Sequence, residues 1–203
     1  MNEKILNQPV KKSSAEEYLM SERHSATKNE FMDGRVLARA GSNRSHSMIV
    51  SNAAIAVGSR MHGHKCEIYI GNMRVKLPNN FVCYPDVVIV NGEPKFSDQN
   101  NDVLLNPTLV LEIFSNETNS SDKTKKLESF LEMESIKECF LVKEDEMRVE
   151  HYAKQNQKQW IYRIYNERDD VISLDSINTK ISLAELYAQI KFKQAEFSSK
   201  AVN

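Results

Sequence analysis

Apolar positions along the chain follow both strand and helix patterns. Nearly continuous apolar runs predict buried strands at 82–90 and 107–114. Apolar residues every three or four positions predict helices at 44–64 and 120–134. Shorter strands are expected at 66–70, 73–77, 137–145, 147–153 and 159–166.

Turn and capping residues add the remaining elements. Asp33-Gly34 is a two-residue turn signal and predicts a hairpin over 29–41. Serine followed by glutamates predicts a capped helix over 13–23, and Ser182 is the expected cap of a helix over 182–190. This order of elements predicts a mixed α/β core with added hairpins. We expect one domain over 13–192, with flexible ends at 1–12 and 193–203.

Composition and charge are those of an ordinary globular chain. The 203 residues are 40% hydrophobic and 27% charged, with a net charge of −1. This balance gives no global attraction to nucleic acid, although a local basic patch remains compatible with it. No apolar run approaches the ~20 residues that cross a membrane, and the first residues lack the apolar centre of a signal peptide. With three scattered cysteines, we expect a reducing, cytoplasmic setting and no membrane association.

Two apolar strands each contain one carboxylate, Asp86 and Glu112. A lone buried carboxylate costs several kcal/mol unless it is paired, protonated or bound to a metal. Two acids on one face of a sheet would suit Mg²⁺, which prefers oxygen ligands. A structural role is the alternative, with Glu112 paired to an arginine such as Arg74.

Lys126 follows in the predicted helix at 120–134. Asp122 lies four residues earlier, so an exposed ion pair with Lys126 is one interpretation. In the other, Lys126 points back over the sheet toward the acids. There it could orient an attacking water or stabilise charge that develops on a phosphate.

Several segments together resemble the Uma-two family of proposed endonucleases, within the PD-(D/E)XK nuclease superfamily. The matching segments, in order, are "NEFMDGRV", "SHSMIVSNAA", "YPDVVIV", "PTLVLEIFSNETNSSDKTKKLESF" and "IKECFLV". The resemblance implies a restriction-endonuclease-like core, in which a central mixed sheet is flanked by helices. It also implies a metal-dependent phosphodiesterase site and often a homodimer.

The resemblance also implies roles for particular residues. Asp86 and Glu112 stand where the family has its two metal-binding acids, and Mg²⁺ or Mn²⁺ is the expected ion. The strand lysine of the superfamily is absent, because Phe114 occupies its position. Lys126 matches a helical lysine that takes over this catalytic role, and Glu30 matches an acid near the family's N-terminus that would add to the metal site.

Three further residues are candidates for substrate binding. His46 could contact a phosphate or act as an auxiliary acid or base, and a surface or capping role is its alternative. Arg74, on a predicted strand, could meet a phosphate backbone or simply face solvent. Lys123 belongs to a locally positive stretch at 122–126, the best candidate for a phosphate contact.

We therefore expect a metal-dependent endonuclease that acts on nucleic acid, with DNA as the expected partner, and that forms a homodimer. The rival hypothesis is a catalytically inactive nucleic-acid-binding or regulatory module on the same fold. The near-neutral charge and the missing strand lysine favour that rival. The sequence leaves the choice of DNA or RNA, strandedness and sequence preference open.

Overall fold

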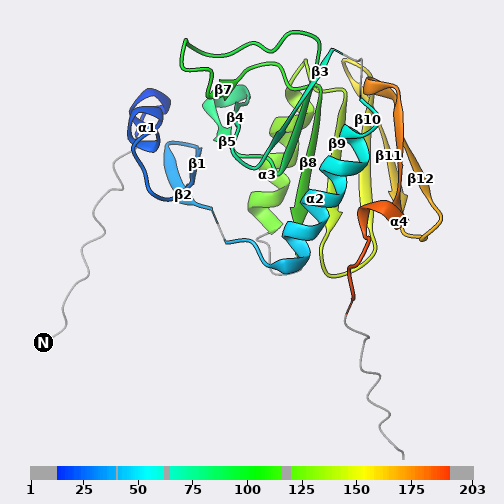
Figure 1. Cartoon of the computed structure of the whole chain (residues 1–203). Coiled ribbons are helices and arrows are strands. Elements are labelled where there is room, and N and C mark those ends of the chain that lie inside the picture. Colours follow the sequence, from blue (N-terminus) through cyan, green and yellow to red (C-terminus); the bar gives the residue numbers. More distant parts are fainter. Residues whose placement is uncertain (1–12, 40, 62–64, 116–119, 193–203) are drawn as a thin grey trace, which may run out of the picture.

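The computed structural model describes residues 13–39, 41–61, 65–115 and 120–192 (Figure 1). The ends predicted to be flexible, 1–12 and 193–203, lie outside the described residues. The α-helices of the described part are α1 (Ala15–Glu22), α2 (Arg44–Gly58), α3 (Ser120–Glu132) and α4 (Leu183–Leu186), with 3₁₀ turns η1 (Pro78–Asn80) and η2 (Asp175–Ile177).

The larger sheet has six strands in the order β11-β10-β9-β8-β6-β3. Their bounds are β3 (Cys66–Ile70), β6 (Val87–Asn91), β8 (Leu109–Phe114), β9 (Glu138–Lys143), β10 (Val149–Asn156) and β11 (Gln159–Tyr165). Strands β8 and β9 are parallel and are connected through α3, whereas the other neighbours are antiparallel. The sheet is therefore mixed, and the predicted mixed α/β class is confirmed.

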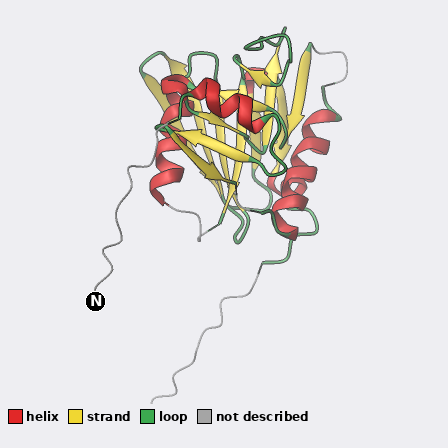
Figure 2. Cartoon of the chain, turned by 90° about the vertical axis from the view of Figure 1, so that its left-hand side faces the viewer, coloured by secondary structure: helices red, strands yellow, loops and turns green. Residues whose placement is uncertain are grey.

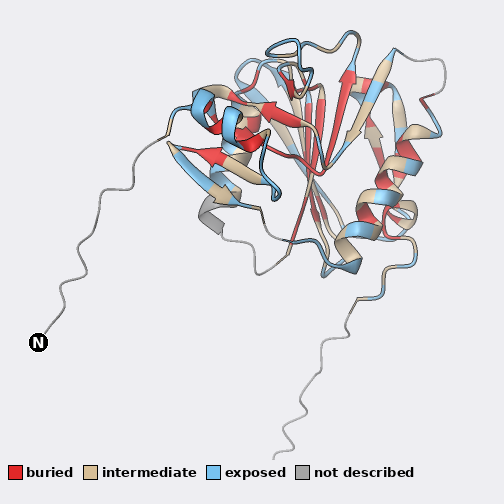
Figure 3. Cartoon of the chain, turned by 60° about the vertical axis from the view of Figure 1, so that its left-hand side comes forward, coloured by how far each residue is buried: buried red, intermediate tan, exposed pale blue. Residues whose placement is uncertain are grey.

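Helices α2 and α3 cover opposite faces of this sheet (Figures 1 and 2). On β6, Val87 and Ile89 pack on the α2 side with Ile49, while Val88 and Val90 pack on the other side with Phe130 of α3. The central strands are accordingly buried on both faces (Figure 3). This explains why their sequences read as continuous apolar runs rather than alternating ones.

The second sheet has five strands in the order β2-β1-β5-β4-β7. Their bounds are β1 (Asn29–Met32), β2 (Arg35–Ala38), β4 (Arg74–Lys76), β5 (Val82–Cys83) and β7 (Val103–Leu104). The predicted hairpin is β1–β2, and Asp33 and Gly34 form its turn with φ of 53° and 79°. Positive φ at both central residues is the requirement of a type I′ turn, so the sequence signal was correct.

The strand predicted over 82–90 is wrong as a single element. The chain leaves the small sheet after Cys83 and enters the large sheet at Val87. Pro85 lies in this crossing, where its missing N–H costs no ladder hydrogen bond. This crossing places Asp86 at the junction of the two sheets.

The C-terminal part contains a hairpin that the sequence analysis missed, β12 (Val171–Leu174) and β13 (Thr179–Ser182). Its strands are too short to establish a clear alternation. Ser182 does cap the final helix, since its side chain accepts a hydrogen bond from the N–H of Glu185. That helix ends at Leu186 rather than at the predicted residue 190.

The state of the cysteines and the character of the helices are both visible in the described residues. Cys66, Cys83 and Cys139 are free thiols, and the latter two are buried. Among the described helices, none combines the length and the apolar character needed to cross a membrane.

Candidate active site

Asp86 and Glu112 lie on the same face of the large sheet. Val87 pairs with Leu111 in antiparallel register, so one step along each strand sets Asp86 opposite Glu112. Side chains alternate between faces along a strand, and this pair therefore shares the α3 side with Val88 and Val110. The backbone N–H of Ile113 also donates to Asp86 Oδ2 at 2.8 Å, which fixes the carboxylate beside β8.

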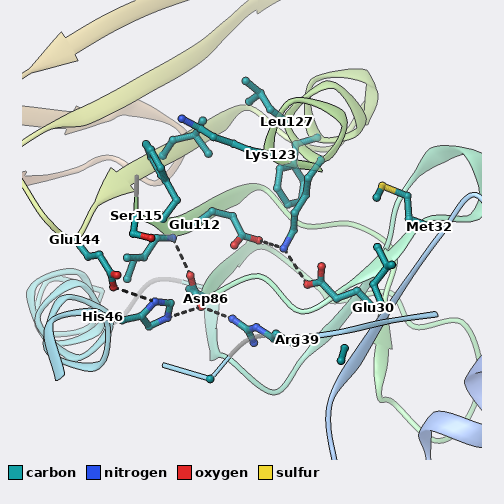
Figure 4. A pocket seen from close by; sticks show the side chains of 18 of the residues that line it. Glu30, Met32, Arg39, His46, Asp86, Glu112, Ser115, Lys123, Leu127 and Glu144 are labelled. Carbon is teal, nitrogen blue, oxygen red and sulfur yellow. Dashed lines mark hydrogen bonds and ion pairs between the residues drawn. The ribbon is translucent and has the colours of Figure 1, made fainter. Parts of the chain in front are cut away.

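Asp86 is buried, and its remaining partners are cationic or can become so. Arg39 Nη2 donates to Asp86 Oδ1, and His46 Nε2 lies 3.0 Å from the same oxygen (Figure 4). Burial by itself raises the pKa of Asp86, but the contacts with His46, Arg39 and the Ile113 N–H outweigh it and lower that pKa. Asp86 is thus an ionised carboxylate at neutral pH.

Glu112 is paired with Lys126, as the second interpretation of the helical lysine predicted. Lys126 Nζ lies 2.8 Å from Glu112 Oε1 and 2.9 Å from Glu30 Oε1. The side chain of Asp122, the alternative partner, lies outside the described residues. The proposed pairing of Glu112 with Arg74 is wrong, because Arg74 Nη2 lies 3.2 Å from Asp102 instead.

The pKa values of this pair reflect burial and excess negative charge. Burial raises the pKa of Glu112 to about 7; Lys126 opposes this rise, and the charges of Asp86 and Glu30 add to it. Burial lowers the pKa of Lys126, but the carboxylates of Glu112 and Glu30 outweigh burial and raise it. Lys126 therefore stays protonated at every pH at which the protein would work.

Glu30 reaches this cluster from β1 in the other sheet. Its Oε1 accepts a hydrogen bond from the backbone N–H of Tyr84 at 3.1 Å, besides contacting Lys126. Tyr84 belongs to the crossing segment that also carries Asp86. The path of the chain between the two sheets therefore positions Glu30 and Asp86 together.

These side chains open into a cavity of about 340 Å³. Its wall is formed by residues from both sheets, from the start of α2 and from α3 (Figure 4). The polar or charged lining residues are Glu30, Arg39, Asn43, His46, Asp86, Glu112, Ser115, Lys123, Lys126 and Glu144. The other lining residues are apolar or glycine, so charged groups and an apolar wall meet at the place where α3 faces the junction of the sheets.

His46 and Lys123, both candidates for substrate binding, line this pocket. Besides Asp86, His46 faces Glu144, with Nδ1 3.8 Å from Oε2. Burial lowers the pKa of His46, but the hydrogen bond to Asp86 and the charges of Asp86 and Glu144 outweigh burial and raise it. Lys123 Nζ lies 3.4 Å from the centroid of the Phe114 ring, and burial lowers its pKa.

Arg74 does not belong to the pocket. Its guanidinium is buried, lies over the ring of Tyr84 at 5.7 Å and pairs with Asp102. Neither of the two readings of Arg74, a phosphate contact or a solvated face, matches this buried position.

Sequence reasoning missed Arg39 and Glu144, which complete the surroundings of Asp86 and His46. Arg39 lies beyond the end of a short hairpin strand, and Glu144 follows a central strand. Nothing in the linear pattern separates them from ordinary surface charges. Among the described residues, no group of three or more histidine, cysteine or acidic side chains is arranged to enclose a metal ion.

The fold and this pocket define a mixed α/β protein with one carboxylate on a central strand, a second directly before the neighbouring strand, and a lysine from an adjoining helix. The model of the Uma2 family, described as "Putative restriction endonuclease", matches residues 15–185. The chain therefore belongs to the Uma2 family, which confirms the resemblance found in its motifs.

Relatives and a solved structure agree with this membership. An uncharacterized protein of Synechocystis sp. is 30% identical over 149 residues, covering 73% of this chain and 84% of its own. A second uncharacterized Synechocystis protein is 26% identical over 186 residues, covering 91% and 96%. A crystal structure described as a putative nuclease belonging to DUF820 from Anabaena variabilis has a TM-score of 0.72 at 18% identity, covering 86% of this chain and 97% of that one. That likeness establishes the shared fold.

Proposed function

We propose that the protein is a metal-dependent endonuclease that hydrolyses phosphodiester bonds of nucleic acid, with DNA as the substrate. The observation that carries the proposal is the cluster of Asp86, Glu112 and Lys126 in this pocket. Two acids can hold a divalent ion for metal-assisted hydrolysis, and a lysine from the adjoining helix can stabilise the charge that develops on the phosphate. Family membership supports the same class of reaction.

The chemistry of the pocket fits a hard divalent cation. Its acidic donors are oxygens, and Glu112 is a buried carboxyl whose pKa is raised by burial and further by the charges of Asp86 and Glu30. Asp86 and Glu112 would hold Mg²⁺ or Mn²⁺, with water or substrate as further ligands, a coordination that Mg²⁺ commonly keeps. When bound, such an ion polarises a phosphate oxygen and lowers the pKa of a coordinated water.

The residues of the chain divide the remaining tasks. Lys126 stays protonated, so we assign it electrostatic stabilisation of the phosphate and orientation of the water rather than a role as general base. Glu30 holds Lys126 in place through its 2.9 Å contact. His46 and Lys123, on the pocket wall, would contact the substrate phosphates.

Cleavage assays test this proposal. Plasmid, linear and single-stranded DNA would be incubated with the protein under Mg²⁺ and Mn²⁺, together with the variants Asp86→Ala and Lys126→Ala. We expect cleavage by the wild type and a loss of at least about 100-fold in both variants. Lys125→Ala is the matched control for the helix, because the Lys125 side chain is 51% exposed and outside the pocket.

Other outcomes would change the assignment in defined ways. Full activity of Lys126→Ala would remove Lys126 from the mechanism and leave the acids. No cleavage of any substrate by folded, metal-loaded protein would contradict the enzymatic proposal.

One observation favours the inactive nucleic-acid-binding module as the second candidate. Both oxygens of Asp86 already accept contacts from Arg39, His46 and the Ile113 N–H. A degenerate site held together by these contacts would need no metal. Such a module would bind labelled DNA and show no heat of binding with Mn²⁺, whereas the enzyme should bind both.

We further propose that the protein acts in the cytoplasm, the setting expected from its scattered cysteines, and that it forms a homodimer, as the family resemblance implies. Sedimentation equilibrium at micromolar concentrations would measure the mass directly. A mass equal to that of one chain throughout this range would contradict the dimer.

A further inference from the structure

The guanidinium of Arg39 is a counter-ion of the buried Asp86 carboxylate. Its Nη2 donates to Asp86 Oδ1, and its Nη1 donates to the carbonyl of Gly71 at 3.2 Å. The Asp86 side chain is 3% exposed, whereas that of Arg39 is 19% exposed and lines the pocket. Because a buried carboxylate is costly without a counter-charge, Arg39 stabilises Asp86 in the protein without metal.

The same contact stands in the way of a cation. Asp86 Oδ2 is taken by the backbone N–H of Ile113, so Oδ1 is the oxygen that faces Arg39 and His46. Figure 4 shows these two side chains approaching Asp86 from different sides. A divalent ion at Oδ1 would meet the guanidinium at close range, where like charges repel strongly in a poorly solvated site.

We infer that Arg39 is a displaceable counter-ion, which holds the metal position at Asp86 and on leaving it binds the substrate phosphate. This inference rests on the proposed function, and it makes Arg39 the residue through which metal binding and substrate binding affect each other. The guanidinium is already on the pocket wall, and its planar fork of donors suits two phosphate oxygens. Substrate that draws Arg39 away from Asp86 would strengthen metal binding, and metal would strengthen substrate binding by the same factor.

The cation that pairs with Glu112 has more carboxylate contacts than Arg39, the cation that pairs with Asp86. The cationic partner of Glu112, Lys126, is also tied to Glu30, which reaches it from the other sheet. Lys126 is thus held by two carboxylates, whereas Arg39 has one carboxylate and one carbonyl among its described contacts. Of these two cations, Arg39 is therefore the one held by fewer carboxylates.

Metal affinity without nucleic acid tests the inference separately from catalysis. Mn²⁺ would be titrated calorimetrically into the wild type, Arg39→Ala, Arg39→Lys and Arg35→Ala. Arg35 is the matched control, an exposed arginine at the start of β2, the strand whose end Arg39 directly follows. We expect Arg39→Ala to bind Mn²⁺ about tenfold more tightly, because a competing charge-assisted hydrogen bond is gone. Arg39→Lys should lie between it and the wild type, and Arg35→Ala should match the wild type.

If Arg39 had only a structural role, Arg39→Ala would damage the pocket and would weaken Mn²⁺ binding rather than strengthen it. Equal or weaker Mn²⁺ binding by Arg39→Ala would overturn the inference, as would the absence of Mn²⁺ binding in all four proteins. If Arg39→Ala does not fold, Arg39→Lys decides the matter by the same comparison. Wild-type protein that binds Mn²⁺ yet cuts no nucleic acid would contradict the proposed function and leave this test intact.

Discussion

At the scale of single residues, the acids of this chain differ by what surrounds them. Asp86 and Glu112 lie opposite each other on one sheet face, yet contacts with His46 and Arg39 lower the pKa of Asp86 while burial raises that of Glu112 to about 7. The sequence identified both as acids on apolar strands. It could not separate their protonation, because the partners come from distant segments.

A third buried acid, Glu138, lies outside the pocket. His151 Nε2 is 3.0 Å from its Oε1, and the backbone N–H and the hydroxyl of Ser176 both donate to its Oε2. Burial raises the pKa of Glu138, but these hydrogen bonds outweigh burial and lower the pKa below its usual 4.5. The cluster ties β9 to η2, which follows the β12–β13 hairpin's first strand.

This lowered pKa makes stability depend on pH in a defined direction. The stabilisation by ionised Glu138 is fully present above pH 4.5 and is lost as the pH falls through the folded-state pKa. Glu138→Gln should cost about 3 kcal/mol of unfolding free energy at pH 7 and should weaken the acid dependence. Urea denaturation between pH 3 and pH 7 measures both.

Glu134→Gln is the control for Glu138, because Glu134 is an exposed glutamate only four residues away. We expect its unfolding free energy to match the wild type within about 0.5 kcal/mol at each pH. Identical pH profiles for Glu138→Gln and the wild type would refute the role of this cluster.

At the scale of elements, the β1–β2 hairpin positions two residues of the site, one on its first strand and one directly after its second strand. Glu30 lies on β1, and Arg39 directly follows Ala38, the end of β2. Local chemistry determines this hairpin, since Asp33 and Gly34 adopt the positive φ that the turn requires. The hairpin could therefore be predicted from sequence, whereas the contacts of its residues depend on the strands it meets.

Substitution at this turn should have a cost that is set by backbone conformation. Gly34→Ala places a Cβ at a φ of 79° and should lower the unfolding free energy by about 1–2 kcal/mol. Gly58→Ala is the matched substitution within α2, where the new Cβ has its nearest neighbour at 3.7 Å. It should raise stability by about 0.5–1 kcal/mol. Thermal and urea denaturation would compare the two, and a neutral Gly34→Ala would contradict the turn's conformation.

At the scale of the whole molecule, the net charge of −1 limits how nucleic acid can be held. Lys126 is already neutralised by Glu30 and Glu112, and the other cationic groups that we propose for phosphate contacts are few and gather at the pocket: Arg39, His46 and Lys123. Binding should therefore depend on local contacts rather than on long-range attraction across the surface.

Salt dependence of DNA binding measures this directly. With about three phosphate contacts, the logarithm of the binding constant should fall against that of salt concentration with a slope of about −3 per chain. Lys123→Ala should make the slope shallower by about 1. The control Lys158→Ala changes an exposed lysine outside the pocket and should leave the slope unchanged. Fluorescence anisotropy with labelled duplex provides the data, and a slope near −8 would reveal a larger basic surface.

The sequence by itself determined the elements whose signals are local. Apolar runs located the central strands, helical spacing located α2 and α3, and the Asp33-Gly34 pair located the hairpin. The same patterns marked Asp86, Glu112 and Lys126, because a charge within an apolar strand and a lysine on an amphipathic helix are visible without any fold.

Only the tertiary structure decided which of these groups meet. The break at Pro85 divides the 82–90 run between two sheets, and this crossing brings Glu30 to Lys126 and sets Asp86 against Arg39 and His46. Arg74, equally plausible in sequence, is instead buried beside Asp102 and Tyr84. Which buried charges pair depends on contacts between residues that lie far apart in the sequence. Sheet order and strand register set these contacts, and the periodicity of a single segment encodes neither the order nor the register.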